Sequence, residues 1–489
     1  MKTRNLLYIL PIFALTACEP DIEDVERSKG SADFSKMVAV GNSLTAGYQS
    51  GALSADGQIN SLPAMIAEQM TQVGGGEFTQ PLLTGEQGSK GVGVDPALAV
   101  TGQVETRLAL KGTVDCLGVQ SVGPVRKGDP YSAVALLTGM ASVAAQGPYN
   151  NQGVPGAKLT DMTNPAYANP FFGRLKTSLP ATMLSMATDL NATFFSLWIG
   201  NNDVLGYATT GGDDGATGPG GLTDAGTFKT AYDAAVAALT ANGAKGVVAN
   251  IPDVTSIPFF TTVPIGTDAV NAANAALLNS AQAYGAYNAG LDQVAADTSN
   301  AFTKAFTQQK ADARKIRFTG GQINTFVVID PSLTDLTVVN PALISMRQAR
   351  PGELMTLTLP GDSIKCAGWG TQKPIPGNYH LTLAEIQKIS NATTAYNNAI
   401  KAAAQAEGLA FVDANARLKE LATTGIVADG ISFSSALVTG GAFSLDGVHP
   451  ATRGYAIIAN DFIDAINASY GSNIPRVNIG SYSTIEVEQ

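Results

Sequence analysis

Short apolar runs alternate along this chain with longer segments that carry a helical repeat, and this alternation constrains the fold most strongly. The apolar runs are short enough to be buried strands, and they cover residues 33–40, 192–199, 246–251 and 409–412. The segments with a helical pattern cover residues 61–72, 179–190, 227–241, 381–407 and 451–468. Strands that alternate with helices are typical of a parallel sheet covered by helices on both faces. The sequence therefore predicts an α/β fold with a central, mostly parallel sheet.

Two long segments fall outside this alternation. Residues 74–131 are rich in Gly, Pro and Gln and show little periodicity, whereas residues 307–375 contain β-like runs. We expect both segments to be insertions into one domain that spans residues 33–470. Residues 471–489 would then form a C-terminal tail.

Three further segments are less regular. Residues 133–137 are a candidate strand, and residues 268–306 are rich in Ala and Asn and are expected to be helical, in one piece or two. Residues 209–226 are rich in Gly, Asp and Thr, which is typical of a loop. Thr382 and Glu385 have the spacing of a capping box and mark the start of the helix at residues 381–407.

The first residues are typical of a leader rather than of a folded segment. Lys2 and Arg4 precede an apolar run at residues 6–15, and Cys18 follows directly after Thr and Ala. A small-residue site that ends in Cys resembles a bacterial lipobox. This resemblance implies a lipoprotein signal peptide at residues 1–17 and attachment of lipid, including palmitate, to Cys18. The alternative is an ordinary signal peptide with a chance cysteine.

Residues 18–32 contain several acidic residues and are expected to be a flexible tether. This acidic start loosely resembles the surface-export signal of some Bacteroidetes lipoproteins. No later stretch of the sequence approaches the roughly 18 apolar residues that a membrane span needs. The sequence therefore predicts an outer-membrane lipoprotein that faces the periplasm or the cell surface and is held to the membrane by its lipid.

The charge balance argues against some partners. The chain has a net charge of −10, and removal of Lys2 and Arg4 with the leader makes it −12. An acidic protein is poorly suited to bind nucleic acid or an anionic membrane surface. We therefore expect no nucleic-acid partner.

Two cysteines remain when Cys18 carries lipid, namely Cys116 and Cys366. Beyond the inner membrane the environment is oxidising, and a disulfide between them is therefore expected. The alternative is two unrelated buried thiols. Because each cysteine falls in one predicted insertion, a bridge would join the two insertions.

Ser43 stands where a strand is expected to turn into a helix. The apolar run Val38–Val40 ends at Gly41, and a helical segment begins at Leu44. A serine at such a turn is exposed at the carboxyl edge of a sheet, where a base can reach its hydroxyl. The alternative is a plain N-cap serine.

A base for Ser43 is available near the C-terminus. The chain contains only two histidines, and His449 lies three residues after Asp446, just before the last predicted helix. This spacing lets the Asp446 carboxylate bond Nδ1 of the imidazole and leaves Nε2 for Ser43. The alternative is a solvated Asp-Gly turn beside a surface histidine. The other histidine, His380, is expected to help position the start of a helix, or else to line a substrate cleft.

Four motifs together resemble the conserved blocks of the GDSL, or SGNH, serine hydrolase family. They are Gly41-Asn42-Ser43-Leu44, Gly156 in a Val-Pro-Gly-Ala sequence, Gly200-Asn201-Asn202-Asp203, and Asp446-Gly447-Val448-His449. The family resemblance implies a three-layer α/β/α sandwich, similar to flavodoxin, enlarged by the two insertions. It also implies a nucleophile, Ser43, and a catalytic Asp446–His449 pair. Asn42 departs from the aspartate of the family name, and this concerns the turn geometry more than the activity.

The resemblance also implies an oxyanion hole. Its donors would be the backbone N–H groups of Ser43 and Gly156 and the side-chain amide of Asn202. Asn202 could instead be a turn asparagine, and Gly153 competes with Gly156 for the glycine role. Asp203 is expected to be structural and to hold the loop of Asn202.

Another segment, Gly361-Asp362-Ser363, spells the family name better than the motif around Ser43. It lies inside an insertion, after Pro360, with no helical pattern behind it, and we do not expect it to be the site. The two histidines and the scattered carboxylates lack the spacing of metal ligands, so we expect neither a metal nor a cofactor.

The sequence therefore predicts a lipid-anchored esterase or lipase, expected to be a monomer. It would hydrolyse a carboxylic ester through an acyl-enzyme on Ser43, and the substrate would be a lipid acyl ester or an O-acetylated glycan. The alternative function is that of a non-catalytic surface lipoprotein that binds glycan or lipid on the same fold.

Overall fold

The computed structural model describes residues 27–83, 88–89, 103–104, 106–127, 131–132, 142–213 and 220–485 of the chain. Cys18 and the leader lie outside these residues, as does the candidate strand at residues 133–137. Within the described ranges, no helix combines the length and the apolar character needed to cross a membrane.

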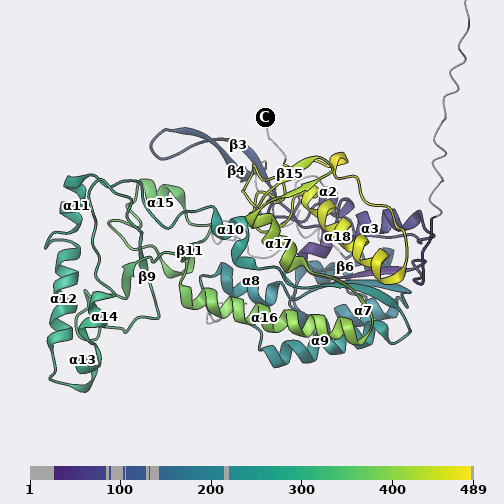
Figure 1. Ribbon diagram of the computed structural model, residues 1–489, viewed down its shortest axis with the longest axis horizontal. Helices are drawn as coiled ribbons and strands as arrows, with labels where there is room; N and C mark the ends of the chain where they lie inside the picture. The colour runs from purple at the N-terminus through teal and green to yellow at the C-terminus, as the bar shows by residue number, and fades with distance from the viewer. Residues whose placement is uncertain are drawn as a thin grey trace, which may run out of the picture.

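A five-stranded parallel sheet forms the centre of the larger body of the molecule, at the right in Figure 1. Its strand order is β13-β8-β7-β1-β6, and every neighbouring pair is parallel. The strands are β1 (Met37–Gly41), β6 (Asn151–Gly153), β7 (Phe194–Trp198), β8 (Lys245–Ala249) and β13 (Ala410–Val412). All residues of β1 and β7 are buried, as expected for strands that helices cover on both sides.

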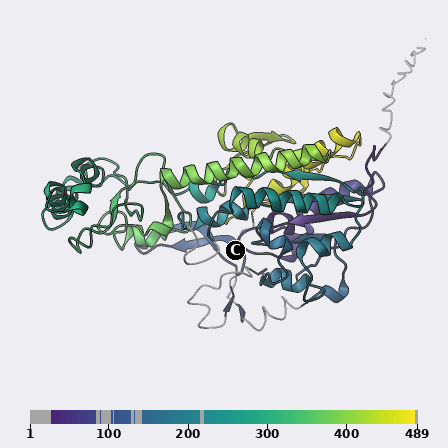
Figure 2. The same cartoon turned by 90° about the horizontal axis from the view of Figure 1, so that it is seen from below.

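Helices cover both faces of this sheet, so the architecture is a mixed α/β sandwich. On one face α3 (Leu62–Thr71) packs against α18 (Thr452–Tyr470). On the other face lie α7 (Met183–Asp189), α9 (Ala225–Thr240) and α16 (Leu383–Ala406), and Figure 2 shows α9 and α16 side by side. The predicted strands and helices of the core therefore correspond to elements of the structure, with ends that differ by a few residues.

The capping box at the start of α16 is present. The N–H of Glu385 donates to the hydroxyl of Thr382 at 3.3 Å, and Oε2 of Glu385 accepts the N–H of Thr382 at 2.7 Å. These two bonds satisfy N–H groups that the first turn of a helix leaves without partners. The sequence pattern predicted this helix start correctly.

The second insertion forms a separate lobe beside the sheet (Figure 1). It contains α11 (Ala272–Leu278), α12 (Tyr284–Ala296), α13 (Ala301–Ala305), α14 (Gln308–Asp312), β9 (Val327–Ile329), β10 (Met346–Gln348) and α15 (Gly361–Lys365). Tyr287 and Leu291 of α12 pack with Ile316 and Leu343 in a core that is distinct from that of the sheet. The lobe therefore includes residues 268–306 and begins well before residue 307, where the insertion was expected to start. Those residues form three helices rather than one or two.

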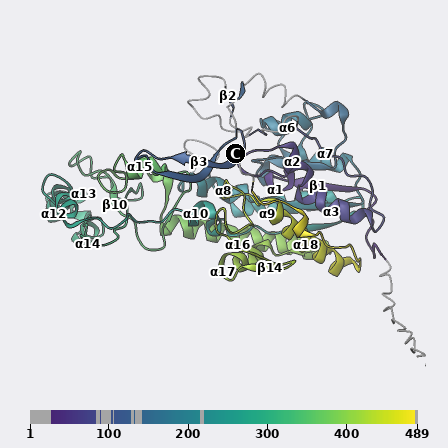
Figure 3. The same cartoon turned by 90° about the horizontal axis from the view of Figure 1, so that it is seen from above.

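The first insertion contains a long antiparallel hairpin that the sequence did not reveal. Its strands are β3 (Leu108–Val114) and β4 (Gln120–Arg126), and a second pair joins β2 (Gln103–Val104) to β5 (Tyr131–Ser132). Half of the residues of β3 and β4 are exposed and only Ala109 is buried, so these strands lack the alternation of apolar and polar residues that identifies a half-buried strand. Figure 3 shows β3 beside α15 of the lobe.

A disulfide joins Cys116 at the tip of the hairpin to Cys366 at the end of α15. Lys365 and Asp115 add an ion pair beside it, with Nζ and Oδ2 2.8 Å apart. The structure therefore contains the bridge expected between the two insertions.

The ends of the described chain pack against the core. Ala32, Ile474, Val477 and Ile479 are buried in the main apolar cluster, and the hydroxyl of Ser31 donates to the carbonyl of Tyr470. The end of the expected tether and the start of the expected tail are thus part of the domain. Both segments are short and lack a helical or strand repeat, so the sequence pattern did not identify them.

The remaining short elements connect these layers. They are α1 (Ser43–Ala46), α2 (Ala55–Ile59), α6 (Pro170–Leu175), α8 (Asn202–Thr209), α10 (Pro258–Thr261), β11 (Leu354–Met355), β12 (His380–Leu381), α17 (Ala414–Thr423), β14 (Ile426–Ala428), β15 (Ile431–Phe433) and several 3₁₀ turns.

Candidate active site

Ser43 follows the first strand of the sheet at a sharp turn. β1 ends at Gly41, and α1 begins two residues later. The side chain of Asn42 accepts the backbone N–H of Leu44 at 3.0 Å and so caps this short helix. A Cβ atom at Gly41 would lie 2.4 Å from the carbonyl oxygen of Trp198 on β7, so the turn requires glycine. Ser43 is thereby held at the carboxyl end of β1.

Asn42 departs from the family motif but makes a contact of its own. It is fully buried, and its Nδ2 donates to Oδ1 of Asn201 at 3.2 Å. A carboxylate at this position has no N–H with which to donate that bond. Asn42 therefore links the turn of Ser43 to the segment that carries Asn202.

The loop before α18 brings His449 to Ser43. Nε2 of His449 lies 2.9 Å from Oγ of Ser43, and its Nδ1 lies 2.8 Å from Oδ2 of Asp446. The backbone N–H groups of Val448 and His449 both donate to Oδ1 of Asp446 at 2.9 Å. The carboxylate thus orients the imidazole ring and also fixes the loop that carries it.

The surroundings of Asp446 stabilise its charged form. Burial acts to raise the pKa of Asp446, but the charge of His449 and hydrogen bonds from His449 and Val448 lower that pKa to about 2. The hydroxyl of Ser444 also donates to Oδ1 at 3.1 Å. An ionised Asp446 favours a proton on Nδ1 of His449, which leaves Nε2 able to accept one from Ser43.

The loop that follows α1 supports this arrangement, although no sequence motif indicated it. The ring of Tyr48 lies 4.7 Å from that of His449, measured between centroids. The backbone N–H of Ser50 donates to the hydroxyl of Ser444, and that of Gly51 donates to Oδ2 of Asp446, each at 2.8 Å. A Ser-Gly pair signals a turn, but no side-chain motif records a contact that a backbone N–H makes.

Gly156 and Asn202 follow the two strands that flank β1. Gly156 is exposed in the loop after β6, with φ of 83°, and Asn202 begins α8 after β7. Nδ2 of Asn202 donates to the carbonyl of Ala157 at 2.8 Å, which joins the two loops. Because β6 and β7 both pair with β1 in parallel, Ser43, Gly156 and Asn202 lie at the same edge of the sheet.

The competing glycine, Gly153, has a different environment. It lies inside β6, and its N–H donates to Oδ1 of Asn151 at 3.0 Å. A Cβ atom at this position would lie 2.4 Å from the backbone nitrogen of Ala46. Gly153 therefore allows the close packing of α1 on β6, and Gly156 is the glycine in the loop beyond the strand.

Asp203 is fully buried below the loop of Asn202. Its two carboxylate oxygens accept the N–H of Leu159 at 2.9 Å and the hydroxyl of Thr223 at 2.6 Å. Burial raises the pKa of Asp203 to about 6, although these hydrogen bonds act in the opposite direction. These contacts fit the structural role expected for Asp203.

The other histidine and the other candidate serine lie outside this arrangement. His380 is buried at β12, where its Nε2 lies 3.0 Å from Oε2 of Glu353. Glu353 in turn pairs with Arg347 at 2.7 Å. Ser363 lies in α15 of the lobe, so a short helix does begin at Gly361, contrary to expectation, and the five-residue helix was too short to show a repeat.

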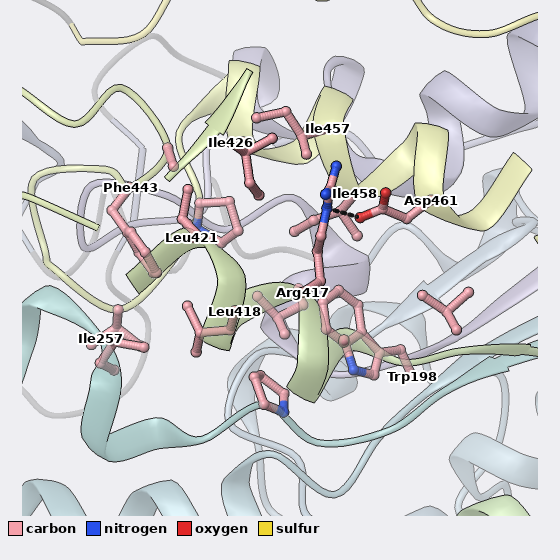
Figure 4. A pocket seen from close by; sticks show the side chains of 18 residues that line it. Trp198, Ile257, Arg417, Leu418, Leu421, Ile426, Phe443, Ile457, Ile458 and Asp461 are labelled. Carbon is pink, nitrogen blue, oxygen red and sulfur yellow. Dashed lines mark hydrogen bonds and ion pairs between the residues drawn. The ribbon is translucent and has the colours of Figure 1, made fainter. Parts of the chain in front are cut away.

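An apolar cavity of about 110 Å³ lies between α17 and α18 (Figure 4). Its wall includes Leu44, which follows Ser43 in the chain, and Val448, which precedes His449. The lining therefore includes the chain neighbours of both residues.

Ser43, His449 and Asp446 form a hydroxyl–imidazole–carboxylate array, which can activate the hydroxyl as a nucleophile. Among the described residues, no cluster of His, Cys, Asp and Glu is suited to hold a metal ion. No protein-family model matches this chain, and no curated protein matches it either.

Proposed function

We propose that this protein is a serine hydrolase of the SGNH type that cleaves carboxylic esters through an acyl-enzyme on Ser43. The observation that carries this proposal is the 2.9 Å contact between Oγ of Ser43 and Nε2 of His449, with Asp446 bound to the other ring nitrogen. The family resemblance of the four motifs and the parallel α/β sheet support the same proposal.

The proposed reaction uses this geometry. His449 removes the proton from Ser43 as its oxygen attacks the ester carbonyl, and the Asp446 carboxylate stabilises the imidazolium that forms. The imidazolium then gives this proton to the leaving alcohol. Water, activated by the same imidazole, cleaves the acyl-enzyme and frees Ser43.

The negative oxygen of the tetrahedral intermediate needs hydrogen-bond donors. We assign this role to the backbone N–H groups of Ser43 and Gly156 and to the amide of Asn202. Their position on adjacent loops at one edge of the sheet supports the assignment. No metal or cofactor enters this reaction.

The alternative is a non-catalytic lipoprotein that binds glycan or lipid on the same fold. A binding protein has no need of an oriented Ser–His–Asp array, so the geometry favours the enzyme. Labelling with a fluorophosphonate probe distinguishes the two functions, because the probe reacts only with an activated serine.

The matched test compares Ser43→Ala with Ser363→Ala. Ser43→Ala should abolish labelling and hydrolysis of p-nitrophenyl esters, whereas Ser363→Ala should retain both. Labelling that persists in the Ser43→Ala protein would refute the assignment of the nucleophile.

We further propose that the protein is a monomeric outer-membrane lipoprotein anchored through Cys18. The lipobox-like sequence before Cys18 supports this proposal. Cells that express the natural sequence should incorporate labelled palmitate into the protein, and cells that express Cys18→Ala should not. Equal incorporation into both proteins would rule out the anchor.

A further inference from the structure

The apolar cavity near Ser43 indicates which kind of acyl group the proposed enzyme would accept. α17 and α18 form its sides, and β14 contributes Ile426. Figure 4 shows hydrocarbon side chains facing one another across the space, from Leu418, Leu421, Ile426, Phe443, Ile457 and Ile458. Such a lining favours an apolar occupant.

The cavity is lined by chain neighbours of two candidate site residues. Leu44 in its wall is the first residue after Ser43, and Val448 is the residue before His449. Both side chains are partly buried and pack against the main core. An acyl chain on Ser43 would therefore enter the cavity past Leu44 or Val448.

The polar groups of the lining already have partners. Nε of Arg417 and Oδ2 of Asp461 lie 3.1 Å apart, and Figure 4 shows this ion pair at one side of the space. Nε1 of Trp198 donates to a backbone carbonyl at 3.0 Å. A sugar in this cavity would bury hydroxyl groups without partners, which is unfavourable, whereas a hydrocarbon chain needs none.

The size of the cavity sets the length of chain that fits. Its volume of about 110 Å³ is several times what a single water molecule needs. On that scale it holds roughly eight groups of the size of water or methylene. An acetyl group would leave most of this space unfilled.

We propose that this cavity binds the hydrocarbon chain of the acyl group, so that the preferred substrate is an ester of a medium-chain fatty acid. This inference rests on the proposed function of Ser43. It assigns the lipid acyl ester, rather than the O-acetylated glycan, as the substrate class.

The test is a series of p-nitrophenyl esters with acyl chains from acetate to laurate. Burial of each methylene should raise kcat/KM by about three- to fourfold. We expect this rise to continue up to an acyl chain of about eight carbons and then to stop. A profile that is highest for acetate would overturn the inference.

Two variants connect this profile to the cavity. Ile458→Trp should fill the space and shift the preference toward short chains, whereas Leu418→Ala should enlarge it and shift the preference toward longer ones. Val427→Trp is the matched control, because Val427 is the exposed neighbour of Ile426 in β14. Its chain-length profile should be that of the natural sequence.

Hydrolysis of the acetate ester shows that each variant is folded and active. If Ile458→Trp and Leu418→Ala hydrolyse this ester with unchanged chain-length profiles, the cavity inference is refuted while the proposed function stands. If the natural sequence hydrolyses no ester of the series and Ser43 is not labelled by a fluorophosphonate, both are refuted.

Discussion

The backbone N–H of Gly51 donates to Oδ2 of Asp446 at 2.8 Å, and this is the same oxygen that contacts Nδ1 of His449. The hairpin of the first insertion is attached at this point, because the N–H of Leu108 donates to the carbonyl of Ser50 at 2.7 Å. The insertion and the candidate carboxylate are therefore connected through two residues of one loop.

We predict that Gly51→Ala lowers kcat by about tenfold or more. Gly51 has φ of 72°, which alanine adopts only with strain, so the loop should move and lose its bond to Asp446. A hydrogen bond to a charged group contributes about 1.5–3 kcal/mol, which corresponds to a factor of roughly ten to a hundred. The measurement is kcat for a p-nitrophenyl ester.

Gly112→Ala provides the control for this prediction. Gly112 lies in β3 of the same hairpin, and a Cβ atom there would contact nothing within 4 Å. Its kcat should match that of the natural sequence. An unchanged kcat in Gly51→Ala would show that the bond to Asp446 does not matter for turnover.

Substitutions of His449 and Asp446 should lower kcat to different extents. His449→Ala removes the base and should leave almost no turnover. Asp446→Asn retains the base but loses the charge that orients it, and precedent from serine proteases puts this loss at about 10⁴-fold in kcat. The amide that this substitution introduces would also face the N–H groups that now donate to the carboxylate.

Asp233→Asn is the control for replacing a carboxylate by an amide outside the candidate site. Asp233 lies on α9 and pairs with Lys229. Its activity should be unchanged. If Asp446→Asn is as active as the natural sequence while His449→Ala is inactive, another group orients the imidazole.

The third prediction concerns the disulfide between Cys116 and Cys366. A soluble form that begins after Cys18 should show no free thiols when it is unfolded without reductant. The double variant Cys116→Ser, Cys366→Ser should be less stable, because the bridge closes a loop with a sequence separation of 250 residues. Chain-entropy models allow about 5 kcal/mol for such a loop, and measured gains are often smaller.

Turnover of a small ester by this double variant should stay within a fewfold of normal. The base of the hairpin is held separately, by the bond from Leu108 to Ser50. Detection of two free thiols in the unfolded, unreduced protein would exclude the bridge in solution.

The sequence allowed prediction of those residues of the candidate site that act through their side chains. Ser43, Asp446 and His449 lie in short motifs next to a strand or a helix, and their spacing already implies how they turn. Gly51 could not be found in this way, because its contribution is a backbone N–H whose direction depends on the folded loop. A similar limit applies to Ser50 and its bond to Ser444.

The core elements were also easier to predict than the insertions. Strand β7 is buried on both sides and therefore reads as an apolar run, whereas β3 and β4 have only one buried residue between them and leave no such pattern. The Ala- and Asn-rich composition of residues 268–306 predicted helix there, but not the partners of α12. Whether Tyr287 and Leu291 pack on the sheet or in a separate lobe is decided by contacts distant in sequence.

The last prediction concerns the buried carboxyl of Asp203. Burial raises its pKa from 3.8 to about 6, so the folded protein binds this proton more tightly than the unfolded chain does. The contribution of this group to the free energy of unfolding is complete below about pH 4 and is lost as the pH rises through 6. The total loss is about 3 kcal/mol, from a shift of about two pKa units. Asp203→Asn should remove this dependence, since an amide can accept the N–H of Leu159 and donate to the hydroxyl of Thr223. We therefore expect the free energy of unfolding in urea, relative to the natural sequence, to increase between pH 5 and pH 8. Asp233→Asn is the matched control, and an equal difference at both pH values for Asp203→Asn would contradict the prediction.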